Sequence, residues 1–560
     1  MKLTEKFNEL RPFDSDMRRR VYLRPTRVVT TSGDVTNAEG LLLDRPGQIS
    51  FDGSGCTIMR GNPDNPARIL LDLGREIHGS MRILVQSTKP TRVTINVRFG
   101  ESVSEALTPE TVHNATNDHA NRDFKLTLGM LSGTDTNESG FRFICLELSE
   151  PDTEIAIKAV EGVLIYRDIE YVGSFECNDE TVNKIYNTAA YTAHLNMQEY
   201  MWDGIKRDRL VWIGDMHPEV MTICSVFGDC DVVPRSLDSL RKITPVGSWM
   251  NGIPAYTLWW VMCQYDYYMQ NGRIDYLREQ QEYLRELIPA LCGYVSPDGS
   301  ECLPDWRFID WPTNDNPGAK HCGLQGLLAL ALNSLAYLCE VLGENELASL
   351  CREKYGLMKK HIPSSEAKSA TALLSLSGIG DAEVLDREVL SVGEAHGYST
   401  FYSYYILAAR ALAGKTAAAL DNMREYYGAM LKLGATTFWE DFNLDWAYND
   451  KGEWDANPID EVVPDGGKDI HADFGAYCYV GLRHSLCHGW SSGPVTFLTR
   501  HVAGIKILEP GCRRIQIKPN LCGLDYIRAS FPTPYGKLTI YTDKSGRLDV
   551  AAPAGVIVEK

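Results

Sequence analysis

The sequence predicts a protein of several domains that contain α and β structure: an N-terminal β-sandwich, a central ring of helical hairpins and a small C-terminal β-sheet domain. Three observations lead to this fold class. The chain has 560 residues, which is too long for one ordinary compact domain. Apolar residues alternate with polar ones near both ends of the chain, and they recur at helical spacing in between. We expect domains at residues 1–170, 171–503 and 504–560.

The first 170 residues show the pattern of β-strands. Val93, Ile95, Val97 and Phe99 alternate with polar residues, as expected for a strand with one buried face. Residues 71–79 carry charged side chains bracketed by glycines. We interpret this segment as a turn of an edge strand with an ion pair at the surface, and a functional loop is the alternative.

A helical pattern begins after residue 177. Asn178 or Asp179 can cap the first turn of a helix. Long loops rich in Gly, Pro, Asp and Trp separate the later helices, and loops of this length in a compact domain are usually functional. Helices in succession with such loops indicate hairpins that close into a ring. The predicted helices include 256–269, 276–291, 324–342, 347–358, 401–412 and 417–433, with the long loops at 243–254, 303–323 and 436–475.

Strands return near the C-terminus. Ile515 alternates with Ile517, and Leu538 with Ile540, between turns that contain Pro, Asn and Gly. This segment is too short to fold alone. We expect a small sheet that packs against the helical ring, with other parts of the chain able to complete it.

Composition excludes several classes of partner. The net charge is −18 and no block rich in Lys or Arg occurs, so nucleic acid and anionic membrane surfaces are poor candidates, and a neutral substrate fits better. The N-terminus lacks the apolar core of a signal peptide, and no run reaches the roughly 18 apolar residues of a membrane-spanning helix. We therefore expect a cytoplasmic protein. The 15 cysteines are scattered without zinc-site spacing, which predicts reduced, mostly buried thiols and no metal site. The sequence carries no signal for an oligomeric state.

Residues 203–219 combine mixed charge with an aromatic side chain. Asp203, Asp208, Asp215 and Glu219 lie among two arginines and a lysine, with Trp212 between two of the acids. Sugar chemistry needs such a set: carboxylates exchange protons, cations hold their pKa values apart, and an indole packs on an apolar sugar face. The alternative is a solvated, salt-bridged face of a helix.

Four motifs resemble those of the bacterial α-L-rhamnosidases, family seventy-eight of the glycoside hydrolases, and their order and spacing match along most of the chain. Residues 203–215, Asp-Gly-Ile-Lys-Arg-Asp-Arg-Leu-Val-Trp-Ile-Gly-Asp, resemble the family signature. Residues 434–440, Gly-Ala-Thr-Thr-Phe-Trp-Glu, look like its second acidic motif, and 485–490, Ser-Leu-Cys-His-Gly-Trp, like its late histidine motif. Residues 73–79 are similar to a strand-turn that precedes the barrel.

The resemblance implies a six-hairpin (α/α)6 toroid flanked by β-sandwich domains, with the sugar bound at one mouth of the toroid. It implies hydrolysis of terminal α-L-rhamnosides with inversion, without metal or organic cofactor, in a form that lacks the extra carbohydrate-binding modules of longer relatives. The matching positions make Asp208 the general acid and Glu440 the general base. Four signature residues and a histidine line the rhamnose pocket: Asp203, Arg207, Trp212, Asp215 and His488.

One position departs from the family pattern. Relatives commonly carry Glu where this chain has Asp208, and Asp is one methylene shorter. Asp215 and Glu219 therefore stay open as the acid, and Asp441 is the substitute for Glu440 as the base. We expect the charges of Asp203 and Asp215 to raise the pKa of Asp208.

Further pocket candidates follow from the residues themselves. Trp212 suits the apolar corner of a 6-deoxy sugar, with burial in the core between helices as the alternative. Trp259 is a candidate as well, with core packing as the alternative. Asp310 lies in a predicted loop, where packing does not require a carboxylate, so it is a candidate for the pocket. His488 competes with His471 and His484, and only the family motif selects it.

Two other functions stay open on the sequence. One is a different catalyst on the same ring, either a hydrolase for another neutral sugar or a polysaccharide lyase, although the acidic signature counts against the lyase. The other is a non-catalytic relative that binds rhamnose, for which Asp208 in place of Glu is the hint.

Overall fold

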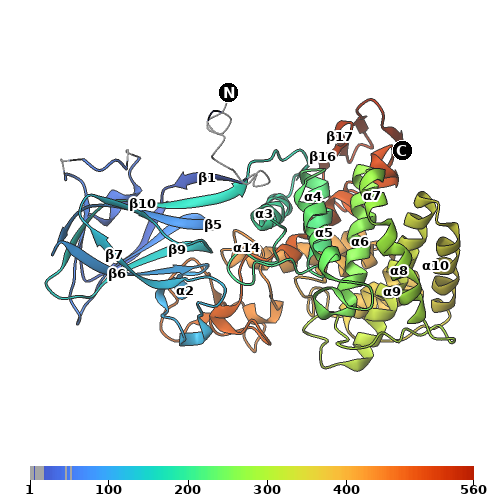
Figure 1. Ribbon diagram of the computed structural model, residues 1–560, viewed down its shortest axis with the longest axis horizontal. Coiled ribbons are helices and arrows are strands. Elements are labelled where there is room, and N and C mark those ends of the chain that lie inside the picture. Colours follow the sequence, from blue (N-terminus) through green and yellow to red (C-terminus); the bar gives the residue numbers. More distant parts are fainter. Residues whose placement is uncertain (1–5, 7–17, 45–46, 51–52) are drawn as a thin grey trace.

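Three regions follow one another along the chain (Figure 1). The structure, a computed structural model, describes residue 6 and residues 18–44, 47–50 and 53–560. An N-terminal sheet domain lies at one end of the molecule, a helical domain fills the other, and a small C-terminal sheet domain packs on the helices. This is the predicted fold class.

The N-terminal domain is one hydrogen-bonded sheet of ten strands, with β3-β4-β10-β5-β9-β6-β7 as its main path. It curls over its main apolar core, so that β10 and β6 lie on opposite sides of the domain in Figure 1. The short helix α2 (Val103–Leu107) follows β6 and faces the helical domain. The strands are β1 (Arg18–Leu23), β2 (Arg27–Ser32), β3 (Asp34–Thr36), β4 (Thr57–Arg60), β5 (Ala67–Lys89), β6 (Arg92–Gly100), β7 (Asp123–Gly129), β8 (Ser132–Asp135), β9 (Ser139–Leu148) and β10 (Glu154–Arg167).

Local pattern and structure agree in β6. Val93, Ile95, Val97 and Phe99 are all buried in the core of the sheet, because alternate side chains of a strand point to the same face. The alternation therefore located this strand correctly.

The interpretation of residues 71–79 as an edge turn with a surface ion pair is wrong. They lie inside β5, whose residues 71–72 pair with β2 on one side and with β9 on the other, and whose residues 77–79 pair with β9. Glu76 and His78 are buried rather than exposed. The register between β5 and β9 shifts between Asp72 and Ile77, where Gly74 has a φ of 82°, so the chain bulges toward the helical domain.

The helical domain begins as predicted. The side chain of Asp179 accepts hydrogen bonds from the backbone nitrogens of Thr181 (2.9 Å) and Val182 (3.2 Å), and α3 starts at the next residue. The helices are α3 (Glu180–Asn196), α4 (Met216–Val226), α5 (Val232–Ile243), α6 (Pro254–Asn271), α7 (Ile274–Glu279), α8 (Gln281–Gly293), α9 (Pro317–Leu342), α10 (Asn345–Met358), α11 (Lys368–Leu376), α12 (Ala382–Leu385), α13 (Ser403–Leu412), α14 (Thr416–Lys432) and α15 (Pro494–Phe497).

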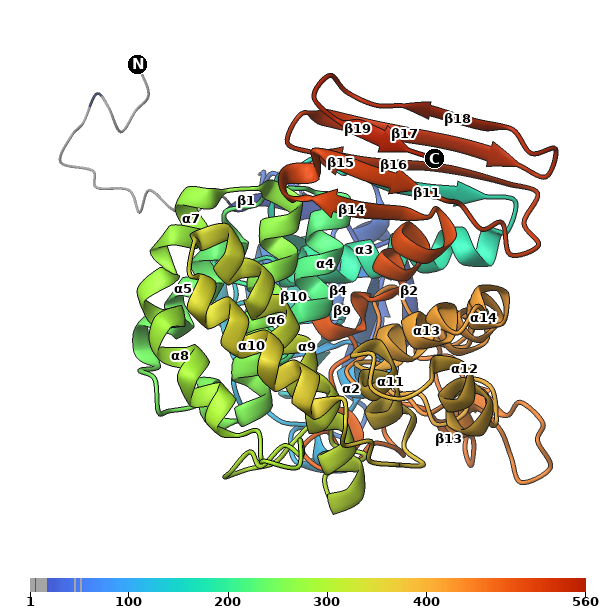
Figure 2. The same ribbon diagram turned by 90° about the vertical axis from the view of Figure 1, so that its right-hand side faces the viewer.

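These helices form the predicted toroid. An inner ring closes on itself, since α4 contacts α6, α6 contacts α9, α9 contacts α11, α11 contacts α13, α13 contacts α15 and α15 returns to α4. Outer helices pack against the inner ones, for example α10 on α9 and α14 on α13. Figure 2 shows α10 outside α9, and it shows α11, α13 and α14 on the right of the ring, opposite α5 and α8. The long predicted loops join these hairpins, and the loop before α9 ends earlier than expected because the helix starts at Pro317.

One helix corrects the expectation about apolar runs. Among the described residues, α9 is long and apolar enough to cross a membrane by length and composition, but 83% of its most apolar window is buried inside the fold. It contacts α6, α10 and α11, as the central helix of a helical core does. The cysteines agree with the prediction, since all are free and most are buried.

The C-terminal domain consists of two small sheets. Its strands are β14 (Ile505–Glu509), β15 (Arg514–Ile517), β16 (Tyr526–Thr533), β17 (Gly536–Asp543), β18 (Leu548–Ala551) and β19 (Ile557–Glu559). A strand from before the toroid, β11 (Ser174–Cys177), pairs with β16 and completes one sheet, as Figure 2 shows. The expectation that another part of the chain completes this sheet is therefore confirmed.

Candidate active site

The signature residues lie in a loop between α3 and α4, at the end of the toroid where the inner helices begin. Asp203, Arg207 and Asp215 are buried, and Asp215 directly precedes α4. The alternative of a solvated helix face is therefore wrong. Asp208 and Arg209 have φ values of 57° and 55°, a conformation that only a tightly held loop imposes on such residues.

Backbone hydrogen bonds join three of the motifs found in the sequence, at residues 203–215, 434–440 and 485–490. The nitrogen of Gly489 donates to the carbonyl oxygen of Asp203 at 2.8 Å, and the nitrogen of His488 donates to that of Phe438 at 3.0 Å. The nitrogen of Glu440 donates to the carbonyl oxygen of Ser485 at 2.9 Å. Segments far apart in the sequence thus form one rigid floor.

Glu440 is held by cationic and neutral donors. Its Oε1 accepts a hydrogen bond from Arg207 Nη2, and its Oε2 accepts one from the backbone nitrogen of Ser485 at 3.1 Å. Burial opposes ionisation of this carboxyl, but the charge of Arg207, assisted by His488, outweighs burial and lowers the pKa of Glu440 to about 2. Glu440 is therefore a carboxylate at neutral pH.

His488 lies at the centre of the carboxylates. Its Nε2 is 3.8 Å from Asp203 Oδ2, 3.9 Å from Asp215 Oδ2 and 3.9 Å from Glu440 Oε1. Its ring packs on Trp490 with the centroids 4.2 Å apart. Burial lowers the pKa of His488 to about 4, so the imidazole is neutral at neutral pH and offers one ring nitrogen to a ligand.

The pKa values of the two aspartates beside His488 shift in the opposite direction from that of Glu440. Burial first, and then the charge of Asp215, raise the pKa of Asp203 well above its usual value. Burial also raises the pKa of Asp215 well above its usual value, although a hydrogen bond from Tyr256 at 3.1 Å opposes the shift. A raised pKa favours the protonated carboxyl, which donates as well as accepts hydrogen bonds and suits sugar hydroxyls.

Glu219 lies behind these aspartates. It is fully buried, and within the described chain neither of its carboxylate oxygens has a hydrogen-bond partner. Burial, followed by the charges of Asp215 and Asp203, raises its pKa well above the usual value. A Cβ atom added at Gly489 would lie 1.6 Å from Glu219 Oε1, so the glycine makes room for this carboxyl.

Asp208 is more exposed than the other acids and has a partner from the N-terminal domain. His119 Nδ1 is 2.7 Å from Asp208 Oδ1 and 2.7 Å from its backbone nitrogen. Trp212 Nε1 donates to Asp208 Oδ2 at 3.0 Å, and Arg207 Nη1 is 3.8 Å from Oδ1. Sequence reasoning missed His119, because it lies in another domain and no local motif marks it.

The two remaining predicted residues, Trp259 and Asp310, are both buried. Trp259 is fully buried and packs against His217 and Tyr405 at centroid distances of 5.2 and 5.0 Å, which corresponds to the core alternative. Asp310 is buried, with Oδ1 accepting from the backbone nitrogen of Thr313 at 3.1 Å. Contact of either residue with a sugar stays a prediction.

Asp441, the substitute base, neighbours Glu440 but differs from it in environment. Burial, and then the charge of Glu440, raise the pKa of Asp441 to about 7. Its backbone nitrogen donates to His484 Nε2 at 2.8 Å. Asp441 is therefore a weaker candidate for a carboxylate that is ionised over the whole neutral range.

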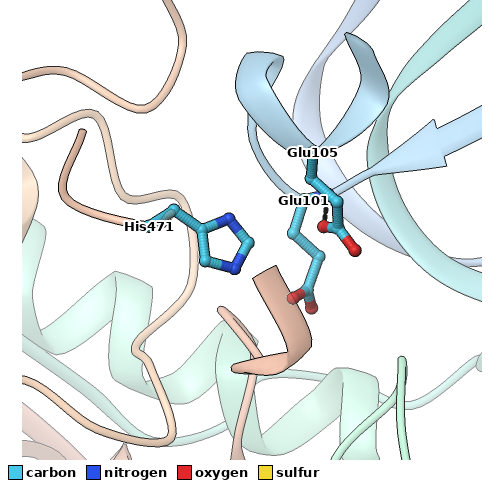
Figure 3. Close-up of side chains that lie close together, drawn as sticks. All are labelled: Glu101, Glu105 and His471. Atoms are coloured by element: carbon cyan, nitrogen blue, oxygen red, sulfur yellow. Dashed lines mark hydrogen bonds between the residues drawn. The ribbon is translucent and has the colours of Figure 1, made fainter. Parts of the chain in front are cut away.

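A buried ion cluster behind the signature joins the N-terminal domain to the toroid. Figure 3 shows Glu101 and Glu105 of the N-terminal domain opposite His471, and possible ligand atoms of these three residues lie within 4.8 Å of one another. Lys206 Nζ, however, lies 3.0 Å from Glu101 Oε2 and 3.2 Å from Glu105 Oε1. His471 Nδ1 forms a hydrogen bond with Ser102 Oγ, and His471 Nε2 forms one with the carbonyl oxygen of His484. The Lys206 ammonium therefore takes the position that a cation would occupy.

The β5 bulge contributes to the same junction. The backbone nitrogen of Glu76 donates to Thr436 Oγ1 at 3.0 Å. Arg142 forms hydrogen bonds of 2.8 Å to both oxygens of Asp72 and one of 3.0 Å to the carbonyl oxygen of Gly434. The N-terminal domain thus positions residues 434–440, at whose end Glu440 lies.

Comparison with known proteins identifies two domains. The family described as bacterial alpha-L-rhamnosidase six-hairpin glycosidase domain matches residues 170–365, and the bacterial alpha-L-rhamnosidase C-terminal domain matches residues 504–559. A curated alpha-L-rhamnosidase from Formosa agariphila is 22% identical over 446 residues, which cover 71% of this chain and 44% of that protein. The chain therefore spans less than half the length of this curated relative.

Solved structures share the fold. A rhamnosidase of glycoside hydrolase family seventy-eight from Bacillus sp. GL1 superposes with a TM-score of 0.74 at 20% identity, over 93% of this chain and 55% of that chain. A rhamnosidase from Klebsiella oxytoca, solved with rhamnose bound, gives a TM-score of 0.66 at 19% identity, over 86% of this chain and 96% of that one. Residues 170–365 and 504–559 therefore match the two domains of bacterial α-L-rhamnosidases in order, and the chain shares the fold of these solved structures.

Proposed function

We propose that the protein is an inverting glycoside hydrolase that releases terminal α-L-rhamnose, with Asp208 as the general acid and Glu440 as the general base. The observation that carries the proposal is the position of Arg207, whose guanidinium bonds to Glu440 and lies 3.8 Å from Asp208 Oδ1. One guanidinium between two carboxyls is compatible with the roughly 6.5–9.5 Å separation that leaves room for a water in inverting enzymes.

Glu440 has the charge state that a general base needs. It is ionised at neutral pH, and each carboxylate oxygen has a second lone pair besides the one used by Arg207 or Ser485. A water between Glu440 and the anomeric carbon would lose a proton to a Glu440 carboxylate oxygen as the water oxygen bonds to the anomeric carbon. The guanidinium also orients the carboxylate toward the pocket.

Asp208 has the position that a general acid needs. Its carboxyl is partly exposed at the mouth, where a leaving group could reach it, whereas Asp203, Asp215 and Glu219 are buried deeper. Its proton would pass to the glycosidic oxygen as that bond breaks. The hydrogen bond from Trp212 and the contact with His119 hold the short side chain in place.

The buried residues suit recognition of the sugar. Asp203 and Asp215 lie close to His488 and have raised pKa values, so their carboxyls can hydrogen-bond to adjacent hydroxyls. The partly buried Trp212 can cover the apolar side of a 6-deoxy sugar. The relative from Klebsiella oxytoca, described with rhamnose bound, supports rhamnose as the ligand class.

The test is turnover of a panel of aryl glycosides with different leaving groups, with the product anomer followed by NMR. Wild-type protein is expected to hydrolyse the α-L-rhamnoside and to release the inverted anomer first. Glu440→Gln should lose about a thousandfold in kcat with every leaving group. Asp208→Asn should lose about as much with a poor leaving group and far less with dinitrophenolate, which departs without a proton.

Two outcomes would contradict this assignment. An Asp208→Asn variant that treats good and poor leaving groups alike would move the acid to Asp215, whose Asp215→Asn variant should then show the leaving-group dependence. Rhamnose binding by calorimetry without turnover of any rhamnoside would favour a non-catalytic binding protein.

A further inference from the structure

An open groove of about 670 Å³ lies where the N-terminal domain meets the signature loop. We name it the Asn121 groove. Residues of the segment between α2 and β7, residues between β8 and β9, and one signature residue form its walls. The lining consists of Asn117, His119, Ala120, Asn121, Thr136, Asn137, Glu138 and Arg209.

The groove begins beside Asp208. His119 lines the groove and contacts the Asp208 carboxyl at 2.7 Å. Arg209, the next residue of the signature, donates hydrogen bonds to the carbonyl oxygens of His119 and of Glu138. The two consecutive left-handed residues therefore bring the acid and the groove wall together.

The polar groups in this groove suit hydroxyl groups. The Asn121 side chain is exposed and makes no hydrogen bond within the described part of the chain. Asn137 Nδ2 donates to the carbonyl oxygen of Asn121 at 2.6 Å, which leaves Asn137 Oδ1 as an acceptor. His119 Nε2 adds one further polar atom, and none of the eight lining residues is Trp, Tyr or Phe.

Aromatic side chains cluster elsewhere on the rim. Trp311 stacks on Tyr477 with centroids 5.4 Å apart, and Trp306 lies 6.1 Å from Trp311. Trp306 and Tyr477 are 44% and 45% exposed. A flat aromatic leaving group would gain most by stacking on this platform, whereas a sugar gains from several hydrogen bonds in a polar groove.

We propose that the Asn121 groove binds the leaving group and that this leaving group is a sugar, so that the substrate is an α-L-rhamnosyl oligosaccharide. The inference rests on the proposed function, because it takes Asp208 as the acid. An acid protonates the oxygen that joins rhamnose to the leaving group, so the leaving group must extend past the acid. The groove is the space that starts there.

The experiment compares two substrates, an α-L-rhamnosyl-hexose disaccharide and an aryl α-L-rhamnoside, through the ratio of their kcat/KM values. The variants are Asn121→Ala and the double Asn121→Ala/Asn137→Ala. Removing one or two hydrogen bonds to the hexose should lower the ratio of disaccharide to aryl rhamnoside by roughly tenfold. The matched control is Asn65→Ala, an exposed asparagine in a turn of the same domain, which should leave the ratio as in the wild type.

The outcomes separate this inference from the proposed function. An unchanged ratio in both groove variants, with a ratio that changes in Trp311→Ala, would overturn the inference and assign the leaving group to the aromatic platform. Because Asn121 has no structural hydrogen bond through its side chain, the single variant is expected to fold and to give a clear result. Failure of the wild type to hydrolyse either rhamnoside would instead overturn the proposed function.

Discussion

Arg207 in the signature loop donates a hydrogen bond to Glu440, a residue 233 positions later in the sequence. Both side chains are buried, so the ion pair is shielded from water. The pair connects the two motifs that would supply the acid and the base, and it fixes the charge state of one of them. Its removal therefore has a defined consequence for the pH dependence of the reaction.

Arg207→Met should move the acidic limb of the kcat/KM profile to higher pH. Glu440 has a pKa of about 2 because Arg207 outweighs burial, and without that charge burial raises the pKa. A base works only when ionised, so a higher pKa requires a higher pH for the same rate. The measurement is kcat/KM over the acidic and neutral range. Arg207→Lys, which keeps a positive charge, should show a smaller shift, and an unmoved limb in Arg207→Met would rule out Glu440 as the titrating base.

His119→Gln should slow hydrolysis by about tenfold for poor leaving groups and by less for good ones. His119 contacts both the carboxyl and the backbone nitrogen of Asp208, so its loss frees the acid to rotate away from the glycosidic oxygen. The measurement is the dependence of kcat on the pKa of the leaving group. His113→Gln, at an exposed histidine of the same segment, is the control. Equal losses with all leaving groups would contradict a role in holding the acid.

Lys206→Met should destabilise the protein by about 3–5 kcal/mol near neutral pH, because it leaves Glu101 buried without its cation and Glu105 with only Arg122, whose Nε lies 3.7 Å away. Burial already raises the pKa of Glu101 to about 7, and loss of the ammonium raises it further. A folded-state pKa above the unfolded value means that the folded protein binds the proton more tightly. The loss of stability should therefore shrink as the pH falls.

Denaturant unfolding at neutral and mildly acidic pH measures this effect. Lys451→Met, at an exposed lysine, should leave the midpoint unchanged. The double variant Lys206→Met/Glu101→Gln should recover part of the stability, since it removes one of the stranded carboxyls. A pH-independent loss in Lys206→Met would show that packing, and not charge, dominates at this position.

Gly489→Ala should lower the unfolding midpoint because its methyl group would meet the Glu219 carboxyl, at 1.6 Å from Oε1 in the present geometry. Glu219 is fully buried, and the close packing of a protein interior resists displacement of its carboxyl. Glu219→Ala removes that carboxyl, so the double variant Gly489→Ala/Glu219→Ala should be more stable than the single glycine variant. Thermal unfolding of the three variants measures the coupling, and strictly additive effects would show that the two residues do not touch.

The sequence by itself determined the elements and the identity of the main site residues. Alternation located β6, and Asp179 located the start of α3, because strand periodicity and helix capping depend on neighbouring residues. The ordered motifs picked out residues that the structure brings together, such as Arg207, Glu440 and His488. These are short patterns whose chemistry can be recognised locally.

Only the tertiary structure decided which residues complete the site. Residues 71–79 are part of a central strand rather than an edge, because strand pairing depends on segments far away in the chain. His119 reaches Asp208, and Glu101 reaches Lys206, only because the N-terminal domain docks on the toroid. The pKa values of Asp203 and Glu440 shift in opposite directions because one carboxyl is buried beside other acids and the other is buried against a guanidinium. Burial and docking depend on the whole fold, and no local pattern in the sequence encodes them.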